Sequence, residues 1–142
     1  MELPFPNGSF GGRGHWIDQT KAGNYTAQYA IADGPDESKI HTVHRVFFKP
    51  DGSKAYDEFS TVTFKPDDKS RIAVTIDSER GSVHGPGYCI DNHCHYELEI
   101  SPGENLEFTF TIGEDQLTGL GSSTNKGNFT YWHETLTREK KK

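Results

Sequence analysis

CHYELEISPGENLEFTFTI, residues 94–112, contains two runs in which apolar and polar side chains alternate strictly. The apolar positions of the two runs are Cys94, Tyr96, Leu98, Ile100, Leu106, Phe108, Phe110 and Ile112, and histidine, glutamate or threonine stands between them. Successive side chains of a β-strand point to opposite faces, so this pattern predicts two strands with one buried face each. The stretch therefore favours an antiparallel all-β fold.

Segments of the same kind, separated by turn-forming residues, continue in both directions from this stretch. They predict ten strands, at residues 15–20, 25–32, 39–49, 54–65, 71–77, 82–90, 94–100, 105–112, 117–122 and 128–138. The clearest connection is Pro50-Asp-Gly-Ser, where Gly52 tolerates the positive φ that a tight hairpin turn needs. Strands joined mostly by hairpins lose their exposed edges most simply by closure. We therefore expect a single antiparallel up-and-down β-barrel, with a two-sheet sandwich or jelly roll as the alternative.

The length and charge of the chain limit its organisation and its partners. Its 142 residues suit one domain, which we expect to span residues 1–142 with flexible ends at 1–12 and 139–142. The formal charge of −6 leaves no broad cationic surface for a phosphate backbone, so nucleic acid is not an expected partner. No stretch approaches the roughly 18 apolar residues of a membrane span, and the first residues lack the features of a signal peptide. We therefore expect a soluble, cytoplasmic protein without a membrane partner.

Residues at the two ends of the chain resemble a known superfamily. Gly14-His15-Trp16 has the Gly-x-Trp pattern that opens the first strand of lipocalins, and Arg138 lies near the end of the last expected strand. The chain thereby resembles the calycins, the superfamily of lipocalin-like and fatty-acid-binding-protein-like barrels. The resemblance implies that Trp16 plugs the closed end of the barrel and that the Arg138 guanidinium stacks on its indole, a contact worth about 0.5 to 2 kcal/mol. It also implies an interior cavity that binds one small hydrophobic or amphipathic molecule.

The hairpin around Pro50-Asp-Gly-Ser brings titratable side chains into this interior. Pairing residues 39–49 with 54–65 places His44 beside Ser60 and Val46 beside Glu58, which makes His44 and Glu58 diagonal neighbours on the inner face. A histidine held by a carboxylate can anchor a ligand or exchange a proton near neutral pH. The alternatives are a purely structural hydrogen-bonded pair, or a register shifted by one residue that turns side chains to solvent.

These observations predict a protein that binds a small hydrophobic or amphipathic ligand and no further cofactor. The alternative is an isomerase, cyclase or hydrolase that uses His44 and Glu58 for proton transfer in the cavity. By analogy with nitrobindin-like calycins, His133 is also a candidate haem ligand, though we expect no haem. The predicted ligand-contacting residues are Tyr29, His44, Phe48, Tyr56, Glu58, Phe64, Tyr96, Phe108, Phe110, Tyr131 and His133.

Residues 87–99 carry two further motifs. Cys89 and Cys94 flank a short connection, so they either form a disulfide across a hairpin or remain two reduced, buried thiols. Gly87, His93, His95 and Glu99 match the first half of the cupin metal motif, which makes a metal-dependent cupin-like enzyme a second alternative. The histidines share the face opposite the apolar row, however, and turning them inward would expose that row to water. We therefore expect no metal at this motif.

Overall fold

The computed structural model describes residues 8–33, 40–64, 70–79 and 81–139. The strands are β1 (Gly8–Asp18), β2 (Ala22–Asp33), β3 (Ile40–Phe48), β4 (Lys54–Phe64), β5 (Arg71–Ser78), β6 (Gly81–Ile90), β7 (His93–Ser101), β8 (Glu104–Ile112), β9 (Gln116–Asn125) and β10 (Asn128–Arg138). The described part of the chain contains no helix, and therefore no helix long and apolar enough to cross a membrane.

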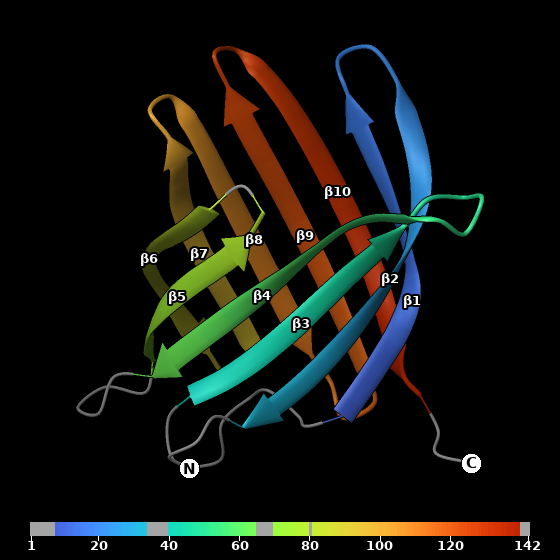
Figure 1. Ribbon diagram of the computed structural model, residues 1–142. Coiled ribbons are helices and arrows are strands. Elements are labelled where there is room, and N and C mark those ends of the chain that lie inside the picture. Colours follow the sequence, from blue (N-terminus) through green and yellow to red (C-terminus); the bar gives the residue numbers. More distant parts are fainter. Residues whose placement is uncertain (1–7, 34–39, 65–69, 80, 140–142) are drawn as a thin grey trace.

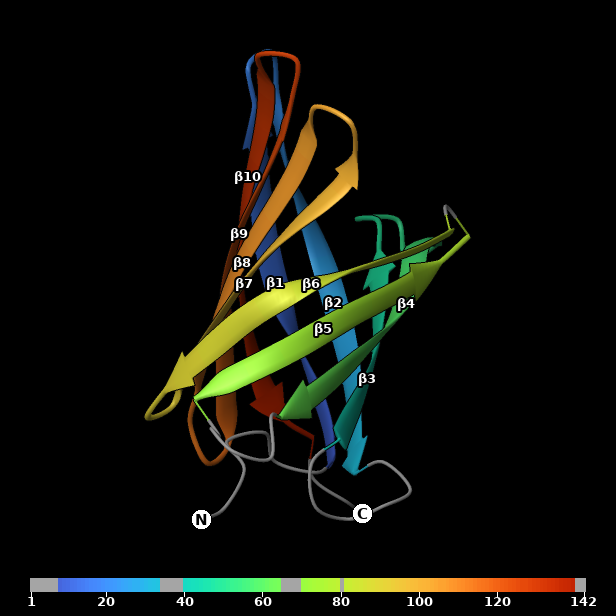
Figure 2. The same ribbon diagram turned by 90° about the vertical axis from the view of Figure 1, so that its left-hand side faces the viewer.

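The strands close into one antiparallel barrel. Each strand pairs with its neighbours in the chain, and β1 also pairs with β10 (Figure 1). This confirms the predicted all-β barrel over the sandwich alternative and is consistent with a calycin-like architecture. The hairpins β1–β2, β7–β8 and β9–β10 extend further than the others at one end, as Figure 2 shows. We call this end, which also holds the β3–β4 turn, the turn end, and the opposite end, where β1 begins and β10 ends, the closed end.

The first strand begins earlier than predicted, at Gly8 instead of His15. Four of its first seven residues are glycine, so this part shows no alternation of apolar and polar side chains. Two of the glycines are required by packing, because a Cβ atom on Gly12 would lie 1.9 Å from the Thr135 carbonyl oxygen and one on Gly14 would lie 2.1 Å from the Tyr25 ring. Residues 8–12 of the expected flexible start thus pair with β10 and β2, while residues 1–7 lie outside the described part.

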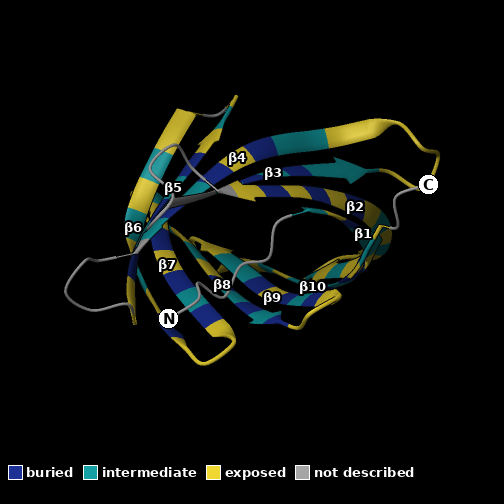
Figure 3. Cartoon of the chain, turned by 90° about the horizontal axis from the view of Figure 1, so that it is seen from below, coloured by how far each residue is buried: buried dark blue, intermediate teal, exposed yellow. Residues whose placement is uncertain are grey.

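The inner face of the barrel carries a buried hydrophobic core that includes the closed end. Burial alternates along the strands, as the predicted period of two requires (Figure 3). Apolar side chains that are at most 5% exposed fill this end: Phe10, Ile31, Val43, Ile112, Leu117 and Leu136. The closed end is therefore part of the hydrophobic core.

The predicted stacking of Arg138 on Trp16 is wrong. In the β1–β10 register, Trp16 lies opposite Trp132, and Arg138 lies opposite Phe10 near the other end of the strand. The Arg138 guanidinium covers the Phe10 ring, 4.8 Å from its centre, and its Nε donates to Asp115 Oδ1 at 3.0 Å. Gly8-Ser9-Phe10 repeats the Gly-x-aromatic pattern six residues before Trp16, and this earlier copy is the one that meets the arginine.

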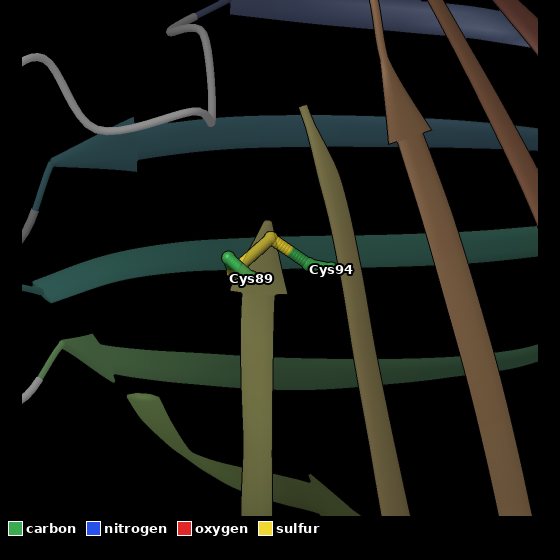
Figure 4. The surroundings of a disulfide bond; sticks show 2 residues. All are labelled: Cys89 and Cys94. Carbon is green, nitrogen blue, oxygen red and sulfur yellow. A yellow bond between two sulfur atoms is a disulfide. The ribbon is translucent and has the colours of Figure 1, made fainter. Parts of the chain in front are cut away.

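Cys89 and Cys94 form a disulfide. They lie directly opposite each other on β6 and β7, with their Cα atoms 4.1 Å apart (Figure 4). Both are buried on the inner face, at 7% and 1% exposure. Of the two alternatives that the spacing leaves open, the structure therefore contains the bridge, which joins the two strands beside the closed-end core.

Candidate functional site

A cavity of about 660 Å³ opens at the turn end of the barrel. Its walls are largely aromatic and include Trp16, Tyr25, Phe47, Phe48, Tyr56, Phe108 and Trp132. Each indole lies against a strand position without a side chain: a Cβ atom on Gly23 would be 2.7 Å from Trp16, and one on Gly121 would be 2.2 Å from Trp132. These two glycines therefore make room for the tryptophans that line the cavity.

The register of β3 and β4 decides which charged groups reach this cavity. The structure pairs Arg45 with Glu58 and His44 with Phe59, and a bulge shifts the register between Phe47 and Phe48. Glu58 faces inward as predicted. His44 does not: it stacks on Phe59 on the outer face, with ring centres 4.2 Å apart, and its Nε2 lies 3.4 Å from Asp57 Oδ2. The expected inward pair of His44 and Glu58 is wrong, because β3 carries apolar residues on both faces and its pattern is compatible with either orientation.

The inward neighbour of Glu58 is an arginine. Arg45 Nη1 donates to Glu58 Oε1 at 2.5 Å, and Arg45 Nη2 lies 3.7 Å from Glu134 Oε1. Both ends of this ion pair are nearly solvent-free, with side-chain exposures of 4% for Arg45 and 8% for Glu58. The guanidinium also packs on three rings, 5.0 Å from the centre of Tyr29, 5.1 Å from Phe47 and 4.7 Å from Phe108. Arg45 is thus the centre of a buried polar cluster between the closed end and the cavity.

Tyrosine hydroxyls complete this cluster. Tyr25 donates to Glu134 at 2.9 Å, Tyr29 donates to the other oxygen of the same carboxylate, and Tyr56 donates to Glu58 at 3.3 Å. Glu134 has no solvent exposure. A carboxylate without water needs donors from the protein, and the two tyrosines supply them.

Burial and the neighbouring charges determine the protonation states of the side chains in this cluster. Burial, followed by the charge of Glu134, raises the pKa of Tyr25. Burial likewise raises the pKa of Tyr29, although the charge of Arg45 opposes the shift. Burial by itself lowers the pKa of Arg45, but the neighbouring Tyr29, Glu58 and Glu134 outweigh it and leave this pKa raised. The hydroxyls therefore stay protonated as donors, and the guanidinium stays charged.

Among the residues that the structure describes, three side-chain polar atoms of the barrel interior are buried without a hydrogen-bond partner from the protein. They are Arg45 Nε, Tyr96 Oη and Ser60 Oγ. An N–H group and two O–H groups buried in this way carry an energetic cost that an acceptor atom of a ligand or of a water molecule would remove. The cluster thus offers donors beyond those its own carboxylates use.

The other predicted ligand-contacting residues lie in different parts of the barrel. Tyr29, Tyr96, Phe108 and Phe110 are buried in the interior, and Phe48, Tyr56, Glu58 and Phe108 line the cavity. Tyr131 and His133 are exposed on the outer face, since Trp132 and Glu134 take the inward positions of β10. The outward direction of His133 does not suit the candidate haem-ligand role. The side chain of Phe64 lies outside the described part of the structure.

Sequence reasoning missed the residues that matter most in the interior, Arg45 and Glu134. Each stands in phase with buried apolar neighbours, Arg45 between Val43 and Phe47, and Glu134 between Trp132 and Leu136. The alternation of inward and outward side chains along each strand therefore places both residues on the inner face, and this was the signal in the sequence. Charged residues are rarely buried unless they are paired, so reading either position alone favours solvent.

A second hollow, of about 880 Å³, lies on the outer side of β1 and β7–β10. We call it the outer groove; its lining includes His15, Ile17, His95, Leu120, Tyr131 and His133. Nearby, ligand atoms of His95, Glu97 and Glu107 lie within 4.8 Å of one another on the surface. His93 and Glu99 also point outward while Tyr96 and Leu98 are buried, as the alternation predicts. The absence of a metal at residues 87–99 stays a prediction.

Comparison with known proteins identifies the architecture alone. The chain matches no protein-family model, and no curated protein matches it. Among solved structures, it is similar to Rv2717c from M. tuberculosis, with a TM-score of 0.75 and 16% identity over 94% of this chain and 92% of that one. It is also similar to the S-type phycobiliprotein lyase CPES from Guillardia theta, with a TM-score of 0.56 and 11% identity over 96% of this chain and 89% of that one. At these sequence identities, the similarity shows a shared barrel fold and nothing further about this chain.

Proposed function

We propose that the protein binds one small amphipathic molecule in the turn-end cavity. The observation that carries this proposal is a buried ion pair, Arg45 with Glu58, in the wall of an open cavity whose lining also includes seven aromatic side chains. Ligand sites combine such apolar walls with a few fixed polar groups, and their volumes run from about 300 to 1,000 Å³. At about 660 Å³, the cavity is large enough to hold a drug-sized molecule.

The charges of the cluster favour a neutral polar end on the ligand. Arg45 is balanced by two carboxylates, Glu58 and Glu134, so the buried cluster itself has no excess positive charge to attract an anion. The unpartnered Nε–H of Arg45, a residue that lines the cavity, is a donor that suits a carbonyl or ether oxygen. The ligand we propose therefore has a flat apolar body and an uncharged acceptor group.

One structural neighbour supports the proposal at the level of architecture. A barrel of this shape is named as a phycobiliprotein lyase, which is compatible with a barrel that accommodates a small molecule. The proton-transfer alternative loses its base, because His44 lies outside the barrel. Binding is thus the function that the geometry supports best.

Blocking the cavity tests the proposal. Ala55 is exposed and lines the opening, so Ala55→Trp places an indole in it without disturbing the core. The probe is N-phenyl-1-naphthylamine, an uncharged amphipathic dye whose fluorescence rises in apolar surroundings. We expect micromolar binding by the natural chain and at least tenfold weaker binding by Ala55→Trp.

A matched change elsewhere provides the control. Ala30 is exposed on β2 and is not part of the cavity lining, so Ala30→Trp adds the same side chain to the outer surface. We expect it to bind the dye like the natural chain. Equal binding by both variants and the natural chain would contradict a ligand site in this cavity.

A further inference from the structure

Two histidines face each other across neighbouring strands of the outer surface. His15 of β1 and His133 of β10 are directly opposed in the strand register, and both are exposed. Directly opposed residues in an antiparallel pair have Cβ atoms about 4.5 to 5.5 Å apart and on the same face. Two imidazoles at that spacing can each direct one nitrogen to a single ion at about 2.0 to 2.1 Å.

A neighbouring side chain holds one of these imidazoles in the form that binds metals. His15 Nδ1 lies 2.6 Å from the amide oxygen of Asn24 on β2. An amide oxygen only accepts hydrogen bonds, so Nδ1 carries the proton and Nε2 keeps its lone pair. Metal-binding histidines usually donate their second ring N–H in this way, because the hydrogen bond orients the ring. Asn24 is therefore a positioning residue for His15.

The surroundings restrict the kind of ion. His15 and His133 lie in the outer groove beside Ile17, Leu120 and Tyr131, and the groove lining that the structure describes contains a single carboxylate, Glu107. Calcium and magnesium require several oxygen ligands, whereas imidazole suits zinc, copper and nickel. We propose that His15 and His133 chelate one divalent transition-metal ion of this class. Water or a donor atom of a small molecule in the groove would complete the coordination.

This site differs from the surface group around His95. There the Nδ1 atom is 2.7 Å from Thr109 Oγ1 and Nε2 is 3.3 Å from a Glu97 oxygen, so both ring nitrogens are already engaged within the protein. The proposal is also independent of the interior cavity, since both histidines point to the opposite side of the sheet. It can fail or succeed without affecting the proposed ligand binding.

Titration of the full chain with Zn²⁺ and Cu²⁺ tests the site. Isothermal calorimetry should find one ion per chain with micromolar affinity. His15→Ala and His133→Ala should each weaken binding at least tenfold, because one imidazole cannot chelate. Asn24→Ala should weaken it by a smaller factor, and Asn24→Asp should restore it. The Cu²⁺-loaded natural chain should show two nitrogen ligands by electron paramagnetic resonance.

The control is His84→Ala, which removes another exposed histidine, on β6 and outside the outer groove, and should bind the ion like the natural chain. Far-ultraviolet circular dichroism and thermal unfolding report that each variant is folded, independently of any ligand in the interior cavity. The proposal is overturned if His15→Ala and His133→Ala leave the affinity unchanged, or if only the control variant loses the ion.

Discussion

The buried cluster makes one substitution especially informative, Arg45→Met. Methionine keeps most of the packing volume but leaves Glu58 and Glu134 without a cation, 2.5 and 3.7 Å from the vacated nitrogen positions. Removing one partner of a buried ion pair costs about 3 to 5 kcal/mol, mainly because the remaining charge stays buried. The free energy of unfolding of domains of this size is about 5 to 15 kcal/mol, so the variant should lose a large share of its stability.

Urea unfolding followed by circular dichroism measures the effect. With a slope of about 2 kcal/mol per molar urea, the loss corresponds to a midpoint lowered by about 2 M. Arg13 is exposed on the outer face of β1, and Arg13→Met should change the stability by less than about 0.5 kcal/mol. This control separates the loss of a buried cation from the loss of a positive charge in general.

A double variant extends the test: it should fold even if Arg45→Met does not, and where both fold it completes a double-mutant cycle. In Arg45→Met, Glu58→Gln, the carboxylate that lies closest to the arginine is also neutral, so the double variant should be more stable than the sum of the two single changes predicts. The coupling should reach at least about 1 kcal/mol, as is usual for residues in one buried network. A loss below 1 kcal/mol in Arg45→Met, with no coupling to Glu58→Gln, would refute the reasoning.

Two further predictions concern alkaline pH and the closed end. Because the folded-state pKa of Tyr29 is raised, the unfolded chain releases its phenolic proton first, and stability should fall as the pH rises above about 10. Urea unfolding between pH 9 and 11 should show a shallower fall for Tyr29→Phe, and an identical fall would contradict the shift. Phe10 is fully buried beneath Arg138, so Phe10→Ala should cost about 3 to 5 kcal/mol by thermal unfolding. Trp16→Ala, at the open cavity, should lower the stability less than Phe10→Ala does and should mainly weaken dye binding. A larger loss of stability in Trp16→Ala than in Phe10→Ala would instead support Trp16 as the closed-end plug.

The sequence predicted strands well where one face is strictly apolar. In β7 and β8, glutamate and threonine separate the buried side chains, so a single orientation is favourable and it is the observed one. In β3, Val43 and Phe47 face inward, Val46 lies on the other face, and Phe48 follows directly at the bulge. The pattern of β3 therefore permits both orientations, and pairing across the bulge decides between them.

The alternation of apolar and polar residues does not predict the interior ion pair, for a different reason. Arg45 and Glu58 come from separate strands, and each is favourable inside only because the other is there. A prediction made position by position assigns Arg45 to solvent. Glu58 was placed inward correctly, but finding Arg45 as its partner needs the observed register. The glycines of β1 hid the start of that strand in the same way, since their role depends on Tyr25 and on the β10 backbone.

The number of strands links the fold to the cavity. The interior of an eight-stranded barrel is about wide enough for side chains to fill, and the diameter grows with each added strand. This barrel has ten strands, and its closed end is filled by large apolar side chains such as Phe10 and Leu136. Toward the turn end, the extra width is spanned by Arg45 and the rings around it, and beyond them the walls no longer meet. The buried cation is therefore both the inner limit of the hydrophobic core and the polar wall of the proposed ligand site, so that its removal should affect stability and binding together.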